Sequence, residues 1–175
     1  MSASAVPARR TAGVVVGDSP LRVWSLSSEL RLRRQLERAG AVDDASHAPR
    51  TVLLRADWVY DDALVRGLCG ADDDVALVAS DGAVVALGLS APEAGVEQML
   101  AAGRAPAAAR KVTPAQIADG YNDALRKREP PYLLPLVAAD LPAIERRIFA
   151  GSYKGVTDLV RSEEHTSELQ SQNAI

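Results

Sequence analysis

The sequence predicts an α/β fold of three layers, in which a mostly parallel sheet lies between helices and contains one antiparallel hairpin. The first supporting observation is that short apolar runs alternate with stretches whose apolar residues recur at helical spacing. The second is the sequence VALVASDGAVVALGL, where two apolar runs flank Asp81 and Gly82. An Asp-Gly pair suits the positive φ angles of a two-residue hairpin turn.

In the first half of the chain, two strands are each followed by a helix. We expect strands at Val14–Val16 and Thr51–Leu54, where apolar residues are consecutive. A helix is expected over Ser27–Ala39, since serines stand at its N-cap and a glycine follows its end. A second, shorter helix should begin at a cap formed by Asp61 or Asp62.

The second half of the chain predicts two further helices, a last short strand and a terminal helix. We expect helices over Pro92–Ala102 and Pro114–Arg128, the latter with Thr113 as its N-cap. The sequence PYLLPLVAAD supplies the strand, and the terminal helix runs from Leu141 to about residue 150. Residues 101–111, rich in alanine, are predicted to be a linker.

Composition excludes several classes of function. The formal net charge is −3, and residues 161–175 hold one Arg and three Glu, so the remainder is close to neutral. No overall basic field indicates a nucleic-acid partner. The single cysteine, Cys69, excludes an internal disulfide, and with two histidines in the chain there is no Cys/His metal pattern.

The sequence predicts a domain organisation of four parts. Residues 1–10 form a disordered leader without the apolar run of a signal peptide, and residues 11–139 form the α/β domain. Residues 140–160 form a helical junction. No stretch approaches the ~20 apolar residues of a membrane span, so we expect this fragment to be soluble and cytoplasmic.

Residues 161–175, RSEEHTSELQSQNAI, differ in composition from the rest of the chain. They contain no valine and no glycine, and they show no apolar period that a helix or strand requires. Residues 161–171 match, in frame, the translation of a common short-read sequencing adapter. We therefore interpret 161–175 as adapter read-through, outside the fold, and expect the natural protein to continue differently after Val160.

Candidate ligand-binding residues follow the two best strands, because open α/β sheets bind ligands beyond the carboxyl ends of their strands. Gly17, Ser19 and Arg22 lie in the first loop and are candidates for binding a nucleotide phosphate. Asp57 lies after the second strand and is a candidate ligand of Mg²⁺. The structural alternatives are that Gly17 forms a turn, Arg22 is a solvated loop residue and Asp57 caps a helix.

The order of these segments also resembles a known family. VVVGDSPLRVWSLSSELRLRRQLERAGA, TVLLRADWVYDDALVRGL and DVALVASDGAVVALGL are similar to the nucleotidyltransferase-like domain, of glycosyltransferase-A type, in some bacterial CDP-alcohol phosphatidyltransferases. IERRIFAGSYKGVTDLV resembles the junction to their membrane domain. The resemblance covers Ala12 to Val160. It implies a parent protein of phospholipid or CDP-alcohol metabolism, located in the inner membrane.

In that family the transferase reaction displaces CMP from a CDP-activated alcohol. It uses spaced aspartates in the order Asp-Gly-x2-Ala-Arg and then Gly-x3-Asp-x3-Asp. The present sequence has no copy of this motif, so no catalytic residue is assigned. The resemblance therefore implies a soluble N-terminal part that reaches the membrane only through a C-terminal domain.

For the soluble domain itself the resemblance leaves two interpretations open. Active nucleotidyltransferases carry a Gly-rich loop with an Arg and a downstream Lys; here Gly17 and Arg22 match, and Asp57 matches the metal-binding Asp. However, the other glycines are absent and Asp18 adds negative charge. One interpretation is a degenerate nucleotide-binding or docking domain whose ligand is CTP or a CDP-alcohol. The alternative is an active Mg²⁺-dependent cytidylyltransferase that acts on a phosphorylated alcohol.

Overall fold

The computed structural model describes residues 10–43, 48–120 and 130–151. The predicted leader therefore lies outside the described residues except for Arg10, and so do residues 152–175, which include the predicted adapter read-through and the second part of the junction. The chain divides into two compact units, one that ends at Ala138 and one that begins at Ala139. In the second unit, residues 141–151 are helical, as the sequence predicts.

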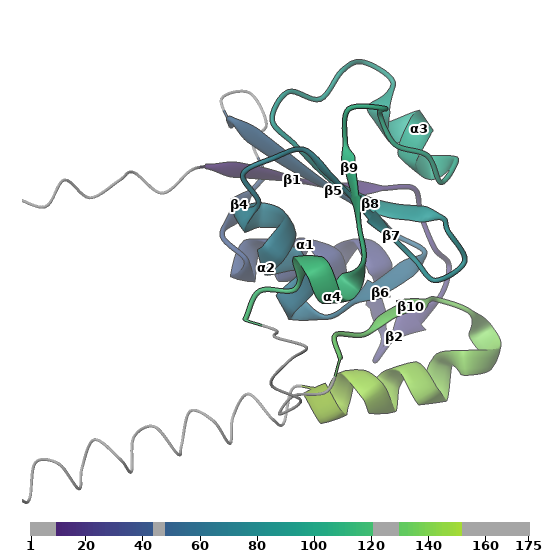
Figure 1. The fold of residues 1–175 in the computed structure, drawn as a ribbon. Helices are drawn as coiled ribbons and strands as arrows, with labels where there is room; N and C mark the ends of the chain where they lie inside the picture. Colours follow the sequence, from purple (N-terminus) through teal and green to yellow (C-terminus); the bar gives the residue numbers. More distant parts are fainter. Residues whose placement is uncertain (1–9, 44–47, 121–129, 152–175) are drawn as a thin grey trace, which may run out of the picture. The chain divides into compact units, whose positions relative to one another are not determined.

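The central element of the first unit is a six-stranded sheet (Figure 1). β1 pairs in parallel with both β4 and β5, β7 pairs in parallel with β9, and β8 is antiparallel to its neighbours β5 and β7. The predicted α/β fold, with a mostly parallel sheet and an antiparallel hairpin, is thus confirmed. In spatial order the strands are β4 (Ala41–Val42), β1 (Thr11–Val16), β5 (Arg50–Arg55), β8 (Val84–Leu89), β7 (Val75–Val78) and β9 (Arg110–Val112).

Helices cover both faces of this sheet (Figure 1). α1 (Ser28–Arg38) and α2 (Asp62–Gly70) contribute to one apolar cluster, and α3 (Val96–Ala101) contributes to another. Leu54 belongs to the first cluster and its neighbour Leu53 to the second, because successive side chains of a strand point to opposite faces. Apolar burial on both faces explains why β5 has a continuous apolar run rather than an alternating one.

Two short antiparallel pairs complete the first unit. β2 (Arg22–Val23) pairs with β3 (Leu26–Ser27) directly before α1. β6 (Trp58–Tyr60) pairs with β10 (Leu133–Pro135), which is the short strand predicted from PYLLPLVAAD. β6 was not predicted from the sequence. The start of β9 falls in the predicted linker 101–111, but β9 instead forms an edge of the main sheet.

The structure confirms that α1 and α2 begin at capping residues predicted from the sequence. Ser27 caps α1 by accepting a hydrogen bond from the Leu30 N–H at 3.3 Å. Asp61 caps α2 by accepting from the Ala63 N–H at 2.9 Å.

The predicted antiparallel hairpin is present, but its turn is not the two-residue turn expected: β7 ends at Val78, β8 begins at Val84, and the Gly82 N–H donates to the Ala79 carbonyl at 2.9 Å. Of the pair Asp81 and Gly82, only Gly82 has a positive φ, +88°, the left-handed conformation that glycine adopts without steric penalty.

Two predicted helices are shorter than expected. α3 begins only at Val96, not at residue 92, because Gly95 before it has a φ of +88°. α4 (Pro114–Ile117) ends after four residues, and Ala118 is already extended. The chain turns there because the Asp119 N–H donates to the Ala63 carbonyl of α2 at 2.9 Å. The rest of the predicted helix, residues 121–128, lies outside the described residues.

None of the helices within the described ranges combines the length and the apolar character that crossing a bilayer requires.

Candidate functional site

The parallel pairing of β1 and β5 brings two of the predicted site segments to one edge of the sheet. Val16, the last residue of β1, is in register with Arg55, the last residue of β5. The Ala56 N–H donates to the Val16 carbonyl at 2.9 Å, so the two chains remain adjacent as they leave the sheet. The backbone of Gly17 and the segment leading to Asp57 therefore start at neighbouring positions.

The loop after β1 is held by its own side chains. Gly17 has a φ of +77°, and a Cβ at this position would meet no atom within 4 Å, so the backbone conformation rather than crowding favours glycine here. The Asp18 carboxylate accepts from the Ser19 N–H at 2.7 Å, and the Ser19 hydroxyl accepts from the Leu21 N–H at 3.3 Å. Two N–H groups that a phosphate would use are thus already hydrogen-bonded within the loop.

Arg22 begins the β2–β3 hairpin and is exposed. Its Nη1 donates to the Ser25 carbonyl across the hairpin at 3.1 Å. The turn residues Trp24 and Ser25 have φ angles of 48° and 67°, a conformation that costs non-glycine residues about 1 kcal/mol or more each. The bond from Arg22 therefore stabilises its own strained turn and occupies part of the guanidinium that was predicted to bind phosphate.

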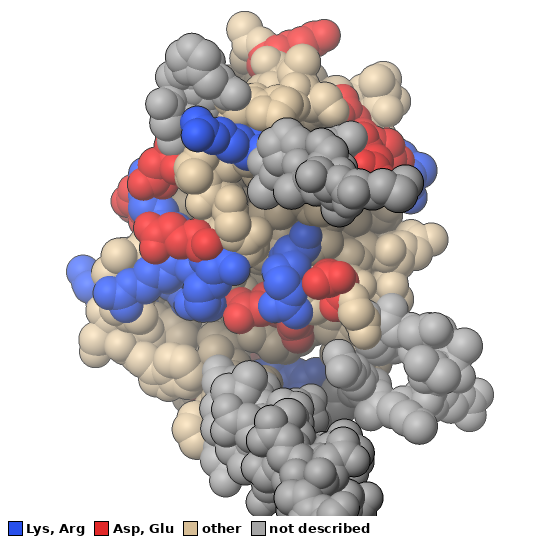
Figure 2. Space-filling view, turned by 90° about the vertical axis from the view of Figure 1, so that its left-hand side faces the viewer, with Lys and Arg blue, Asp and Glu red and all other residues tan. Residues whose placement is uncertain are grey.

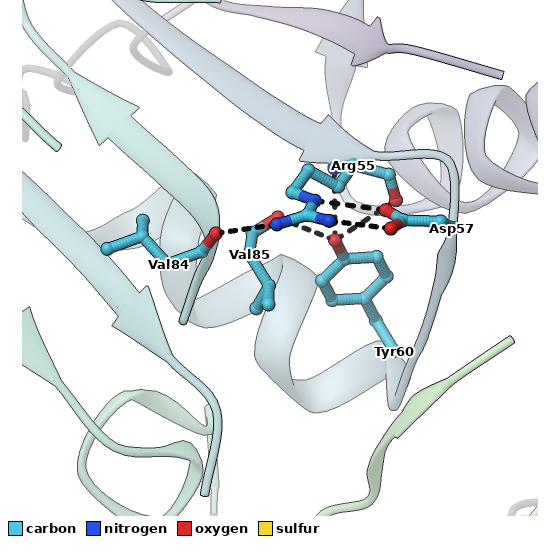
Figure 3. A network of polar contacts seen from close by, with 5 residues as sticks. All are labelled: Arg55, Asp57, Tyr60, Val84 and Val85. Carbon is cyan, nitrogen blue, oxygen red and sulfur yellow. Dashed lines mark hydrogen bonds and ion pairs between the residues drawn. The ribbon is translucent and has the colours of Figure 1, made fainter. Parts of the chain in front are cut away.

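Asp57 follows β5 and forms a bidentate ion pair with Arg55 (Figure 3). Arg55 Nε donates to one carboxylate oxygen at 3.0 Å and Nη2 donates to the other at 2.6 Å. The Arg55 side chain is 18 % exposed and that of Asp57 is 45 % exposed. The hydrogen bond to Asp57 raises the pKa of Arg55 above its ordinary value, and burial opposes that shift.

This ion pair determines what Asp57 offers to a metal ion. Both carboxylate oxygens accept from Arg55, so Mg²⁺ at this position would share them with a guanidinium or displace it. Among the described residues, no group of three His, Cys, Asp or Glu side chains is arranged to hold a metal ion.

Tyr60 completes the network beneath the ion pair (Figure 3). The ladder between β5 and β8 ends at the pair Leu54 and Ala86, beyond which the two strands diverge. The Tyr60 hydroxyl fills this gap: it accepts from the Arg55 N–H at 3.0 Å and donates to the Val85 carbonyl at 2.7 Å. Burial raises the pKa of Tyr60 far above its ordinary value, so this hydroxyl stays protonated.

Arg55 and Tyr60 are site residues that the sequence pattern did not indicate. Arg55 follows the predicted strand Thr51–Leu54, but neither it nor Tyr60 was singled out as a candidate site residue. The same holds for Arg31 of α1, whose Nη2 donates to the Trp58 carbonyl at 2.9 Å, directly after Asp57. Helical periodicity places Arg31 one position before the buried Leu32. Periodicity does not reveal which residue of another element Arg31 contacts.

A separate hollow of about 500 Å³ lies on the α3 side of the sheet. Thr51 and Leu53 of β5 and the segment 90–98 contribute to its lining, and it contains none of the predicted site residues. Where Figure 2 shows described residues, basic and acidic side chains are intermixed.

A scan against protein-family models gives no match, and a search of curated proteins likewise finds no significant match.

Proposed function

We propose that the α/β domain is a nucleotidyltransferase-like domain of glycosyltransferase-A type that binds a nucleotide, or docks to a partner, without catalysing nucleotidyl transfer. Its ligand is CTP or a CDP-alcohol. The observation that carries this proposal is the bidentate ion pair between Arg55 and Asp57. It lies where an active enzyme of this kind would present an open carboxylate to Mg²⁺ and the triphosphate.

Two further features support a binding role over a catalytic one. The segments of Gly17 and Asp57 leave neighbouring parallel strands, where ligands of open α/β sheets bind. Yet the loop N–H groups of Ser19 and Leu21 are hydrogen-bonded to side chains of the loop itself. A ligand here would meet a preorganised edge that lacks the free donors and the free carboxylate of a triphosphate-cleaving site.

Calorimetric titration of the domain with CTP, with and without Mg²⁺, tests this proposal. We expect binding that is nearly independent of Mg²⁺ and no release of pyrophosphate when a phosphorylated alcohol is added. Asp57→Asn should leave CTP affinity unchanged, as should the control Asp73→Asn, which changes an exposed Asp that pairs with Arg110 before β7. Mg²⁺-dependent binding that is lost in Asp57→Asn, together with pyrophosphate release, would instead establish the active cytidylyltransferase.

We also propose that the parent protein belongs to the CDP-alcohol phosphatidyltransferase family and that its transferase chemistry resides outside residues 1–160. The absence from the sequence of the spaced-aspartate motif of that chemistry supports this division. The test is to recover the natural gene beyond Val160, express it in membranes and measure CMP release from CDP-diacylglycerol. CMP release by the isolated domain, or a gene without the spaced aspartates, would refute this assignment.

A further inference from the structure

The hollow beside α3 has the size of a small-molecule binding site. Its volume of about 500 Å³ falls within the roughly 300–1,000 Å³ that is typical of ligand pockets. Val14 of β1 and Leu53 of β5 are in register across the parallel pair, and both line the hollow. Leu53 belongs to the apolar cluster on the α3 side, whereas Val14 packs against that cluster and is only partly buried. The chain therefore leaves part of an apolar floor open on this face of the sheet.

Thr51 adds a polar group to this floor. Side chains alternate along β5, so Thr51 points to the same face of the sheet as Leu53. Thr51 is 5 % exposed, and no described residue forms a hydrogen bond with its hydroxyl. Because Thr51 lines the hollow, a ligand there could supply the missing partner. Three other unpaired atoms, all on α1, are instead sealed from solvent: Ser28 Oγ, Arg31 Nε and Gln35 Oε1.

The part of the hollow formed by the segment that leads into α3 is acidic. Glu93 and Glu97 are exposed residues of this segment, and both line the hollow. Neither carboxylate forms an ion pair or a hydrogen bond with a described residue. The described lining contains no Lys and no Arg, so the two carboxylates give the hollow a negative potential. This potential favours a cation and disfavours an anion such as a phosphate.

The polar groups of the hollow differ in charge and in burial, and this difference specifies the ligand. The carboxylates are exposed, so a cation that pairs with them keeps part of its hydration. The Thr51 hydroxyl is buried and neutral, and it can donate to or accept from a neutral polar group. Apolar atoms of the ligand would cover the floor at Val14 and Leu53.

We propose that this hollow binds a small organic amine, with an ammonium group at one end, an aliphatic body and a neutral hydrogen-bonding group at the other end. Glu93 and Glu97 bind the ammonium group, and Thr51 bonds to the neutral group. Thr51 is near the amino end of β5, whereas Asp57 follows the carboxyl end of that strand. The proposed nucleotide site and this amine site are therefore separate, and neither depends on the other.

NMR titration of the isotope-labelled full chain tests the proposal with three matched probes. Aminopentanol carries its amine and its hydroxyl at opposite ends of the chain, pentylamine lacks the hydroxyl, and pentanediol lacks the charge. We expect aminopentanol to bind most tightly and to shift the amide signals of Thr51 and of residues 90–98. If millimolar aminopentanol shifts none of these signals, or if the three probes bind equally, the proposal is wrong.

Thr51→Val removes the hydroxyl and keeps the shape of the side chain. It should weaken the binding of aminopentanol by about fivefold and leave that of pentylamine unchanged. The urea midpoint should not fall, because the lost hydroxyl had no partner among the described residues. The control Thr11→Val makes the same change on the opposite face of the sheet, the face on which Gly13 meets Leu36, and should match the wild type. Equal weakening of aminopentanol and pentylamine by Thr51→Val would overturn the role of the hydroxyl.

The charged end of the site is tested by the double variant Glu93→Gln, Glu97→Gln. It should weaken the binding of both amines by about threefold or more and leave pentanediol unchanged, since only the amines carry a charge. The control Glu37→Gln, at an exposed residue of α1, should bind all three probes as the wild type does. Unchanged binding of both amines by the double variant would show that the carboxylates do not hold the ammonium group.

Discussion

Two polar regions border β6, and they differ in how completely their groups are paired. On one side, Arg55, Asp57 and Tyr60 form a closed network whose donors and acceptors meet at the end of the β5–β8 ladder. On the other side, α1 leaves Arg31 Nε and two further side-chain oxygens unpaired. The first arrangement satisfies its buried polar groups, whereas the second leaves buried polar atoms unpaired, which costs stability. The following changes test this comparison, in decreasing order of expected effect.

Tyr60→Phe should be the most damaging change. It removes the hydroxyl while keeping the ring, and it leaves the Val85 carbonyl and the Arg55 N–H buried without partners. We expect the free energy of unfolding to fall by about 2 kcal/mol, measured by urea denaturation. Phe149→Leu, at a side chain that is 64 % exposed, serves as the control. An unchanged urea midpoint for Tyr60→Phe would show that the network is not what stabilises this end of the sheet.

Asp57→Asn should have a smaller effect on stability. The amide keeps the shape of the side chain but loses its charge and one of the two acceptors that Arg55 uses. Because Asp57 is 45 % exposed, solvent screens the pair, and we expect a loss of about 1 kcal/mol in urea denaturation. A loss as large as that of Tyr60→Phe would mean that the ion pair, not the hydroxyl, dominates the network.

Arg31→Met should leave stability nearly unchanged. The variant loses the hydrogen bond to the Trp58 carbonyl, but it also removes a partly buried cation that has no carboxylate partner within the first unit. These two effects oppose each other, so replacement by an apolar side chain of similar length should be tolerated. A loss of stability comparable to that of Tyr60→Phe would break the comparison, since Arg31 would then be as well paired as Arg55.

The exposed ion pair between Arg110 and Asp73 should matter least. The guanidinium hydrogen bond lowers the pKa of Asp73. A lowered carboxyl pKa stabilises the fold above the pKa of the unfolded state, and this contribution is lost as the pH falls through the folded value. Arg110→Gln should therefore give the same urea midpoint as wild type in acid and at most a slightly lower one at pH 7. A large decrease at pH 7 would contradict the screening argument.

Prediction from sequence was most successful where the signal was local. The caps were predicted to within one residue, as Ser27 or Ser28 and Asp61 or Asp62. The structure selects Ser27 and Asp61, whose side chains accept from N–H groups two or three residues away. The hairpin was predicted from Asp81 and Gly82, although only Gly82 adopts the positive φ that a two-residue turn would require of both. In contrast, the helix from Pro114 stops early because its end bonds to α2, a contact that helical propensity does not contain.

The candidate site was predictable only in its position on the sheet. Asp57 was placed at a strand end by the apolar run before it, and its proximity to Gly17 followed from parallel pairing. Its partner Arg55 is two residues away, but extended and turn backbones permit many side-chain directions, so the sequence did not indicate the pair. The nucleotide and metal roles of these residues stay predictions.

The sequence by itself determined the apolar periods, the caps and the glycine turns, because each depends on the conformations of residues that are close together in the chain. Only the tertiary structure decided that Tyr60 bonds to Val85, 25 residues later, and that Arg31 bonds to Trp58, 27 residues later. These contacts depend on where β5 and β8 diverge and on the face that α1 presents to β6. Both follow from packing of the whole domain, which also decides which buried polar groups find a partner.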